Sequence, residues 1–451
     1  MAASPVTTER DSWATRLGFI FAAVGSAVGL GNMWRFPYVV SEGGGAALVV
    51  LYLAIVALVG IPLMTAEFVV GRLSQRSPLV ALPQLGRSTA WAPLGWLFIL
   101  CGFGILSYYS VIAGWTLRYA FDAIRNAIPS DTGAYFAEAS TGWDAAALHL
   151  LFMAMTIWIV VQGVRKGLER SVLVMMPILF VLLLGLAIWA GTLEGGGGGY
   201  AYYLRPDFSA LGQIDILADA AGQAFFSLSL GMGALMTYAS YLRSKENLSR
   251  EATVVALSDF GVAFVAGLVV FPVIAAFALR DQVGESAVGA LFIALPKAFE
   301  SLGRAGDFVD TAFFVLLFVA ALSSAISLLE VVVTAAIDRW GWRRSRAALL
   351  TGGLITLLGV PSALDTDFLG ALDQITGNFL LLLGGFFTAI LVGWRAFPEA
   401  DAELAQGLAS PGLRRVWGVL LRYVAPVFLL AVLVTSAGPT WQAVTTLFGL
   451  G

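Results

Sequence analysis

The stretch Gly25-Ser26-Ala27-Val28-Gly29-Leu30-Gly31-Asn32 lies in the middle of an apolar run, Trp13 to Val40, that is long enough to cross a bilayer. Each glycine weakens an α-helix by about 1 kcal/mol relative to alanine. Backbone that leaves a helix inside a membrane exposes unpaired N–H and C=O groups, which is tolerated only where protein or a polar cavity satisfies them. The stretch therefore predicts a transmembrane helix that is broken at a ligand site.

The composition around this stretch is that of a membrane protein. Of 451 residues, 59% are hydrophobic and 12% are charged, whereas soluble proteins carry about 25% charged residues. The sequence holds one cysteine, Cys101, and one histidine, His149, which excludes an internal disulfide and a thiolate or histidine metal cluster. Because it also lacks a Ser-His nucleophilic pair and a nucleotide-binding loop, we expect no enzyme activity and no nucleic-acid partner.

Apolar runs separated by breakers predict an all-α polytopic protein with eleven transmembrane helices. The expected spans are residues 14–39, 45–71, 91–124, 145–162, 167–191, 215–242, 250–277, 307–337, 347–360, 369–394 and 415–437. Several exceed 25 residues, which indicates tilted or protruding helices.

The basic residues predict the orientation of these spans. Arginine and lysine concentrate in the N-terminal segment and in every second loop, while the remaining loops hold only Arg118, Arg125, Arg205, Arg280, Lys297 and Arg304. By the positive-inside rule the N-terminus is cytoplasmic, and eleven spans then place the C-terminus outside. We expect a multi-pass protein of the cell inner (plasma) membrane, in contact with membrane lipid.

The sixth span carries a second interruption, Gln223 to Gly233, with serines and paired glycines at mid-membrane. Spans 1 and 6 are the first members of two five-span halves, and an odd number of spans per half makes the halves inverted repeats. We expect a transport core over 13–397, with repeat 1 at about 13–191 and repeat 2 at about 215–397. A cytoplasmic segment, 1–12, precedes the core. Residues 398–451 follow it as a cytoplasmic linker, helix 11 and an external tail. Paired interrupted spans indicate a transporter binding site.

The two breaks supply two kinds of group. Half-helix N-termini offer N–H groups for a carboxylate, and unwound carbonyls offer oxygens for a hard cation such as sodium. An amino acid with sodium matches both. A carboxylate inside a span is costly, so Asp259 is interpreted as functional. Ser323 and Ser324 either ligate a cation or only allow close helix packing. Glu67 is expected to accept hydrogen bonds from unwound N–H groups.

At this point the chain resembles the neurotransmitter:sodium symporter family, including its bacterial amino-acid transporters. The resemblance rests on WATRLGFIFAAVGSAVGLGNMWRFPY (13–38), VGIPLMTAEFVVGR (59–72), SYYSVIAGWTL (107–117), GQAFFSLSLGMGALMTYASY (222–241), AALSSAIS (320–327) and ALDQITGN (371–378). It implies two sodium sites, a substrate site between them, and a gate on each side.

The residues that the resemblance assigns to each role are as follows. The sodium ligands are Gly25, Ala27, Val28, Asn32, Ser227, Asp259, Ala320, Ser323 and Ser324. The substrate-binding residues are Ala27, Gly31, Ile105, Tyr109, Phe226, Ser227, Ser229, Met232, Ser324 and Leu328. The outer gate is Arg35 with Asp373, together with Phe226 and Tyr109. The inner gate is Arg10 with Asp338, buttressed by Trp13, Ser240 and Tyr241.

Some positions suggest finer properties. Asp259 is similar to the acid of chloride-independent relatives, with Tyr52 and Gln223 beside it, so we expect no chloride requirement. Met232 replaces a bulkier phenylalanine of some relatives and leaves room for a large side chain. Gly167 and Pro177 have a spacing that in similar bacterial members allows span 5 to unwind.

The resulting hypothesis is sodium-coupled symport of a hydrophobic, bulky or aromatic L-amino acid into the cell by alternating access. The alternatives are sodium-coupled uptake of another small amine or an osmolyte, and a channel or non-transporting nutrient sensor on the same fold. Neither the oligomeric state nor the sodium stoichiometry follows from the sequence.

Overall fold

The computed structural model describes residues 11–209, 214–242, 246–279 and 290–448, and these residues form helices without any strand. Within them, nine helices are long and apolar enough to cross a membrane. These helices are Ala46–Ser74 (α3, η2 and α4), Thr89–Ile124 (η3 and α6), Trp143–Val161 (α8), Val164–Ala190 (η4 and α9), Leu248–Ala276 (α13), Arg304–Trp340 (α17), Arg344–Leu364 (α18), Thr366–Arg395 (α19, η7, α20 and η8) and Pro411–Thr445 (α22, η9 and most of α23).

The first predicted span is broken in the structure. Helix α1 (Arg16–Ala27) ends where the quoted stretch begins to unwind, and the chain resumes as η1 (Gly31–Arg35) and α2 (Phe36–Glu42). The two parts are bent by 46° and together make a tenth candidate span. The predicted broken helix is confirmed.

The predicted sixth span is divided between α11 (Ile214–Ser227) and α12 (Ala234–Ala239). Neither helix has the length to cross a bilayer alone. The two helices and the intervening residues 228–233 occupy the position that the sequence assigned to span 6. The all-helical, polytopic fold is therefore the one expected.

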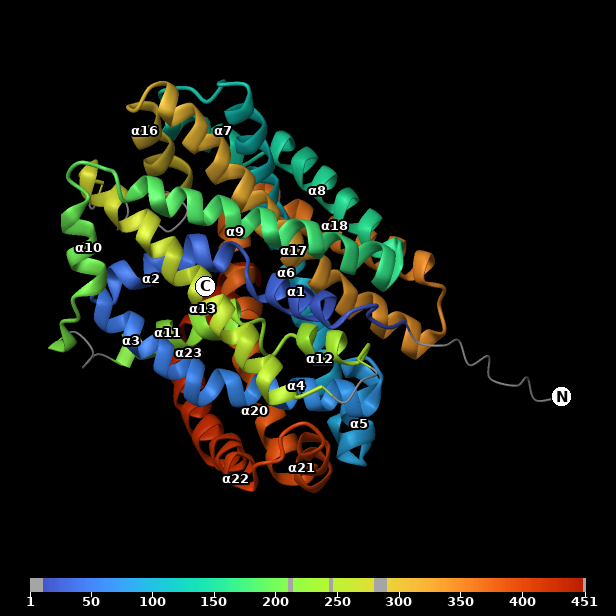
Figure 1. The fold of residues 1–451 in the computed structure, drawn as a ribbon. Coiled ribbons are helices and arrows are strands. Elements are labelled where there is room, and N and C mark those ends of the chain that lie inside the picture. Colours follow the sequence, from blue (N-terminus) through green and yellow to red (C-terminus); the bar gives the residue numbers. More distant parts are fainter. Residues whose placement is uncertain (1–10, 210–213, 243–245, 280–289, 449–451) are drawn as a thin grey trace.

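The centre of the bundle is formed by α17 and α6 (Ala92–Ile124), which pack along each other beside α1 (Figure 1). Their apolar windows are 89% and 83% buried, compared with 33% for the span containing α9 (Arg170–Ala190). The span that contains α9 therefore exposes most of its apolar side chains, as lipid-facing helices do.

Short helices occupy the connections. They are α5 (Pro78–Gly86), α7 (Thr132–Ser140), α10 (Gly197–Leu204), η6 (Ala290–Ala294), α16 (Leu295–Glu300) and α21 (Phe397–Ala405). The connection between α9 and α11 contains α10, which is anchored to α13. The buried Tyr203 donates a hydrogen bond to the Phe264 carbonyl at 3.0 Å and stacks on Phe271. The aromatic residues that follow the glycines at the start of α10 supply this attachment.

Candidate functional site

The break between α1 and η1 is packed too closely for side chains at its glycines. A Cβ atom on Gly29 would lie 2.5 Å from Ser324 Oγ, and one on Gly31 would lie 3.0 Å from the Phe226 ring. The Asn32 side chain caps the unwound segment, because its Oδ1 accepts the Gly29 N–H at 2.9 Å. The glycines thus bring backbone against α17 and α11.

The second break is shaped by residues in the left-handed region. Ser229 has φ of 53°, Gly231 has 75° and Gly233 has 78°. A Cβ on Gly231 would lie 2.1 Å from the Leu381 carbonyl oxygen, so glycine is required there. The buried Glu67 accepts the Gly231 N–H at 2.8 Å. Glu67 therefore satisfies an unwound N–H group of this second break.

A cluster of oxygen-bearing side chains joins the two breaks, and we call Asn32, Ser227 and Asp259 the carboxylate cluster. All three are buried. The Asn32 amide nitrogen donates to Asp259 Oδ1 at 2.6 Å and to Ser227 Oγ at 3.1 Å. Ser227 Oγ donates to the two oxygens of Asp259 at 2.9 and 2.8 Å. η1, α11 and α13 thus each contribute one side chain to the cluster.

Tyr52 and Gln223 surround the carboxylate cluster, as the sequence indicated. The Tyr52 hydroxyl lies 3.5 Å from Asp259 Oδ2, and the Gln223 amide donates to the Gly31 carbonyl at 2.9 Å. The described residues place no arginine or lysine side chain in an ion pair with Asp259. The carboxylate is therefore held by neutral donors only.

A second oxygen cluster lies on the other side of α1. The Ser324 hydroxyl is 3.4 Å from the Gly25 carbonyl oxygen, 3.3 Å from that of Ser26 and 3.4 Å from that of Val28. The neighbouring Ser323 hydroxyl donates to the Ala320 carbonyl at 2.9 Å. The Ser324 hydroxyl thus meets carbonyls of α1, whereas the Ser323 hydroxyl bonds back within α17.

Between the two clusters lies a cavity, the central cavity, lined by residues from both breaks, α6 and α17. Its walls are Ser26, Ala27, Gly29, Leu30, Gly31, Ile105, Tyr109, Phe226, Ser227, Ser229, Met232, Ser324 and Leu328. Every predicted substrate-binding residue is among them. The Tyr109 hydroxyl lies 3.3 Å from the Leu30 backbone nitrogen, and Ser229 Oγ donates to the Ser26 carbonyl at 2.7 Å.

The predicted outer-gate ion pair is not formed in this structure. Arg35 donates to the Asn378 side chain and lies over the Phe226 ring, 5.4 Å from its centroid. Asp373 instead accepts from the Tyr108 hydroxyl at 2.6 Å. Within the described residues, then, Arg35 and Asp373 belong to separate contacts. Asn378 and Tyr108 are the partners instead, and Arg35 Nη1 is buried without an acceptor among the described residues.

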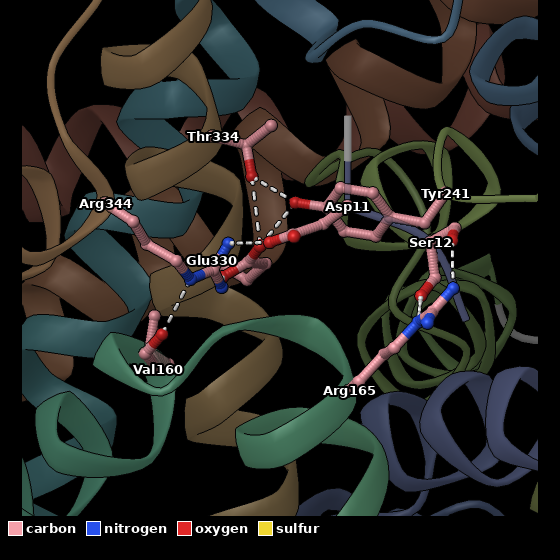
Figure 2. Close-up of polar contacts among 8 residues, drawn as sticks. All are labelled: Asp11, Ser12, Val160, Arg165, Tyr241, Glu330, Thr334 and Arg344. Atoms are coloured by element: carbon pink, nitrogen blue, oxygen red, sulfur yellow. Dashed lines mark hydrogen bonds and ion pairs between the residues drawn. The ribbon is translucent and has the colours of Figure 1, made fainter. Parts of the chain in front are cut away.

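At the opposite end of α1, Trp13 and Tyr241 occupy the predicted inner gate. Trp13 Nε1 donates to the Tyr238 carbonyl at 2.9 Å. Figure 2 shows the Tyr241 hydroxyl pointing at the carboxylate of Glu330, which also forms an ion pair of 2.5 Å with Arg344. This buried network connects α17, α18 and the chain that follows α12.

The structure describes the remaining inner-gate residues only in part. Arg10 lies outside the described residues. Its predicted partner Asp338 accepts the Ser77 N–H at 2.6 Å and lies 3.5 Å from Arg76. Ser240 donates to the Thr237 carbonyl at 2.5 Å within its own segment.

Two buried carboxylates of the inner end were not anticipated. Glu330 lies inside an apolar span, so the argument used for Asp259 applied to it equally. Glu169 accepts from the Ala14 and Thr15 N–H groups at 2.7 and 3.0 Å and from the Thr15 hydroxyl at 2.7 Å. It lies near the start of the predicted span 167–191 and directly before Arg170, and an acidic residue at the basic end of a span gave no signal of burial.

Comparison with known proteins decides the family. The model of the sodium:neurotransmitter symporter family matches residues 10–144 and 139–445. The chain belongs to this family. It is therefore a multi-pass membrane protein and a sodium-dependent transporter rather than an enzyme, consistent with the helical bundle and its two breaks.

Individual relatives match this chain over nearly its whole length. The chain is 35% identical to an uncharacterized sodium-dependent transporter of Methanocaldococcus jannaschii, over 95% of this chain and 91% of that one. It is 34% identical to one of Bacillus subtilis, over 94% and 97%. It is also similar to the crystal structure of MhsT in complex with L-phenylalanine, with a TM-score of 0.88, 42% identity, and coverage of 95% of this chain and 100% of that chain.

Proposed function

We propose that this symporter couples sodium to the uptake of a hydrophobic, bulky or aromatic L-amino acid, without a chloride requirement. The observation that carries the proposal is the carboxylate cluster, which sits at the wall of the central cavity. Ser227 belongs to both, so a cation at the cluster and a ligand in the cavity share a wall. Coupling is then a contact between sodium and substrate.

The first sodium site is assigned to the Ala27 carbonyl with Asn32, Ser227 and Asp259. Sodium, like other hard cations, prefers amide, hydroxyl and carboxylate oxygens. Asp259 and Ser227 already bring such oxygens within 2.9 Å of each other. Rotation of the Ser227 hydroxyl hydrogen away from the carboxylate frees the Ser227 and Asp259 oxygens for the ion. The Asn32 amide must also turn, because its nitrogen rather than its oxygen faces Asp259 in this structure.

The second sodium site is assigned to the carbonyls of Gly25, Val28 and Ala320 with the hydroxyls of Ser323 and Ser324. The Ser324 hydroxyl lies 3.3–3.4 Å from three carbonyl oxygens at the end of α1, which supports this assignment. An ion at this position would bridge α1 to α17, so its loss would release α1.

The substrate side chain is assigned to the apolar part of the central cavity, formed by Ile105, Met232 and Leu328. Its carboxylate is assigned to the N–H groups of the first break and to the Tyr109 hydroxyl. The cavity volume is about 20 Å³ here, room for a water molecule but not for an amino acid. Met232, with its flexible thioether, and Phe226 must therefore move to admit substrate. The L-phenylalanine complex of MhsT supports this substrate class.

Chloride independence rests on Asp259. A fixed carboxylate at the first sodium site supplies the negative charge that a chloride ion would otherwise contribute. The hydrogen-bond partners of Asp259 are neutral, and no arginine or lysine among the described residues forms an ion pair with it.

We further propose a cytoplasmic N-terminus, an external C-terminus and two inverted repeats at about 13–191 and 215–397. Residues 1–12 and 398–451 flank this core. In this arrangement Phe226, Tyr109, Arg35 and Asp373 close the external side. Trp13, Ser240, Tyr241 and the pair Arg10 and Asp338 close the cytoplasmic side. The vestibule that contains Arg35, Asp219 and Asn378 lies above Phe226.

Uptake into proteoliposomes tests the proposed function. Labelled L-phenylalanine should accumulate above its external concentration under an inward sodium gradient, and not when potassium replaces sodium. Equilibration without accumulation would indicate a channel, and binding without any uptake would indicate a sensor. Competition by the other amino acids, by amines and by osmolytes distinguishes the substrate classes.

A further inference from the structure

A second cavity lies far from the two breaks, between α21, α22 and η9. We call it the basic pocket and define it by Phe397, Asp401, Arg414, Arg415, Arg422 and Tyr423. Its volume is about 300 Å³, much larger than that of the central cavity. α21 and α22 lie together at one edge of the bundle (Figure 1). None of the residues assigned to sodium, substrate or the gates lines this pocket.

The basic pocket holds an excess of positive charge. Three arginines face one carboxylate, and Arg414 Nη1 pairs with Asp401 Oδ2 at 2.8 Å. The other two carboxylates of α21 are committed elsewhere, in the 2.5 Å ion pairs of Glu399 with Arg87 and of Glu403 with Arg72. Two guanidinium charges therefore have no carboxylate partner in the pocket.

The arginines retain hydrogen-bond donors. Arg414 Nε is buried and finds no acceptor among the described residues. The exposed Arg415 side chain makes no hydrogen bond or ion pair with the part of the chain that the structure describes. Arg422 is held in place, with Nε donating to the Gly393 carbonyl at 2.5 Å and its guanidinium 3.6 Å from the Phe397 ring centroid. The basic pocket thus holds one anchored arginine, Arg422, beside Arg414 and Arg415, which keep N–H donors without an acceptor among the described residues.

The surface next to the basic pocket is apolar and exposed. Tyr423 is 53% exposed and Val427, one turn further along the span, is 70% exposed. Such side chains on a transmembrane helix face lipid tails. The two ion pairs to Arg72 and Arg87 join α21 to the end of the bundle where basic residues concentrate. The pocket therefore lies where lipid tails give way to headgroups.

We propose that the basic pocket binds the phosphate group of an anionic phospholipid, whose acyl chains lie along the exposed face of η9 and α23. Guanidinium groups bind phosphate through two parallel hydrogen bonds, which suits Arg415 and Arg414. Basic pockets between transmembrane helices are suited to anionic headgroups. A zwitterionic lipid brings its own cation, so it gains less from the excess charge.

Native mass spectrometry of the purified full-length protein tests this site. We expect more bound phosphatidylglycerol than phosphatidylcholine at equal lipid concentration. Arg415→Gln should lower that preference about fivefold, the effect of removing one basic side chain near the headgroups. Because the exposed Arg415 side chain makes no hydrogen bond or ion pair with the described residues, this variant should fold normally. Arg343→Gln removes the same charge from another exposed position and should leave the preference unchanged.

Three results would overturn the proposal. The first is equal retention of both lipids by the unmodified protein. The second is an equal loss of preference in Arg415→Gln and Arg343→Gln. The third is displacement of phosphatidylglycerol by equimolar inorganic phosphate, which would show that the pocket takes free phosphate rather than lipid. Lipid retention is read without transport, so the outcome is independent of the sodium-coupled function.

Discussion

At the scale of single residues, Asp259 carries the proposed independence from chloride. Asp259→Asn keeps the size of the side chain and removes its charge, so sodium at the first site loses a balancing anion. We expect sodium-driven uptake to fall at least tenfold in gluconate and to recover in part when chloride is supplied. Uptake into proteoliposomes in the two salts measures this.

Asp131→Asn is the matched control for that variant, because Asp131 caps α7 in an exposed connection. It should transport normally in both salts. Full activity of Asp259→Asn in chloride-free buffer would remove the role proposed for this carboxylate.

Ser324 tests the second sodium site. Ser324→Ala deletes the hydroxyl that approaches three α1 carbonyls, and a hydrogen-bonding group that meets a charge contributes about 1.5–3 kcal/mol. The sodium concentration for half-maximal uptake should rise about tenfold. Ser107→Ala serves as control, since that buried hydroxyl bonds only within α6. An unchanged sodium requirement in Ser324→Ala would argue against the second site.

Gly29 tests the close approach of the first break to α17. Gly29→Ala places a Cβ atom 2.5 Å from Ser324 Oγ and 3.1 Å from the Tyr109 hydroxyl, so either the Ser324 side chain or the backbone of the break must shift. We expect loss of L-phenylalanine binding with little loss of folded protein. Gly353→Ala, where a Cβ meets nothing within 4 Å, should bind normally. Scintillation proximity binding compares the two, and equal binding would contradict the assigned geometry.

At the scale of elements, Glu169 links the start of α1 to η4. Its carboxylate accepts three hydrogen bonds from Ala14 and Thr15, directly before α1, and a Cβ on Gly18 would collide with it at 2.2 Å. η4 spans Val164–Glu169 and includes Gly167, where span 5 was predicted to unwind. Unwinding of η4 would therefore release Ala14 and the N-cap Thr15 of α1 in the same motion.

Glu169→Gln should loosen this end of α1 without touching the sodium sites. Replacing a carboxylate by an amide weakens charge-assisted hydrogen bonds, which contribute about 1.5–3 kcal/mol. We expect amide hydrogen exchange in the first turns of α1 to become about tenfold faster, measured by mass spectrometry. Glu138→Gln, at an exposed position of α7, is the control. Equal exchange in Glu169→Gln and the unmodified protein would exclude the proposed link.

At the scale of the whole molecule, the sequence was most informative where local chemistry conflicts with the bilayer. Glycines inside an apolar span predicted the break at 25–32, and a charge inside a span singled out Asp259. The residue-by-residue site came from family resemblance rather than from spacing. The structure then placed every predicted substrate residue on one cavity wall.

What escaped prediction depends on three-dimensional neighbours. Arg35 contacts Asn378 rather than Asp373, a choice between partners on one helical segment that no linear pattern distinguishes. Glu169 joins segments more than 150 positions apart, and its polar surroundings in sequence conceal its burial.

The central claim is that sodium and substrate bind in direct contact, so each must strengthen the other's binding by the same factor. The most direct measurement is the dissociation constant of L-phenylalanine over a range of sodium concentrations, paired with that of sodium over a range of L-phenylalanine. The account predicts equal factors in the two titrations and loss of this coupling in Asn32→Ala. An L-phenylalanine affinity that does not change when potassium replaces sodium would contradict it.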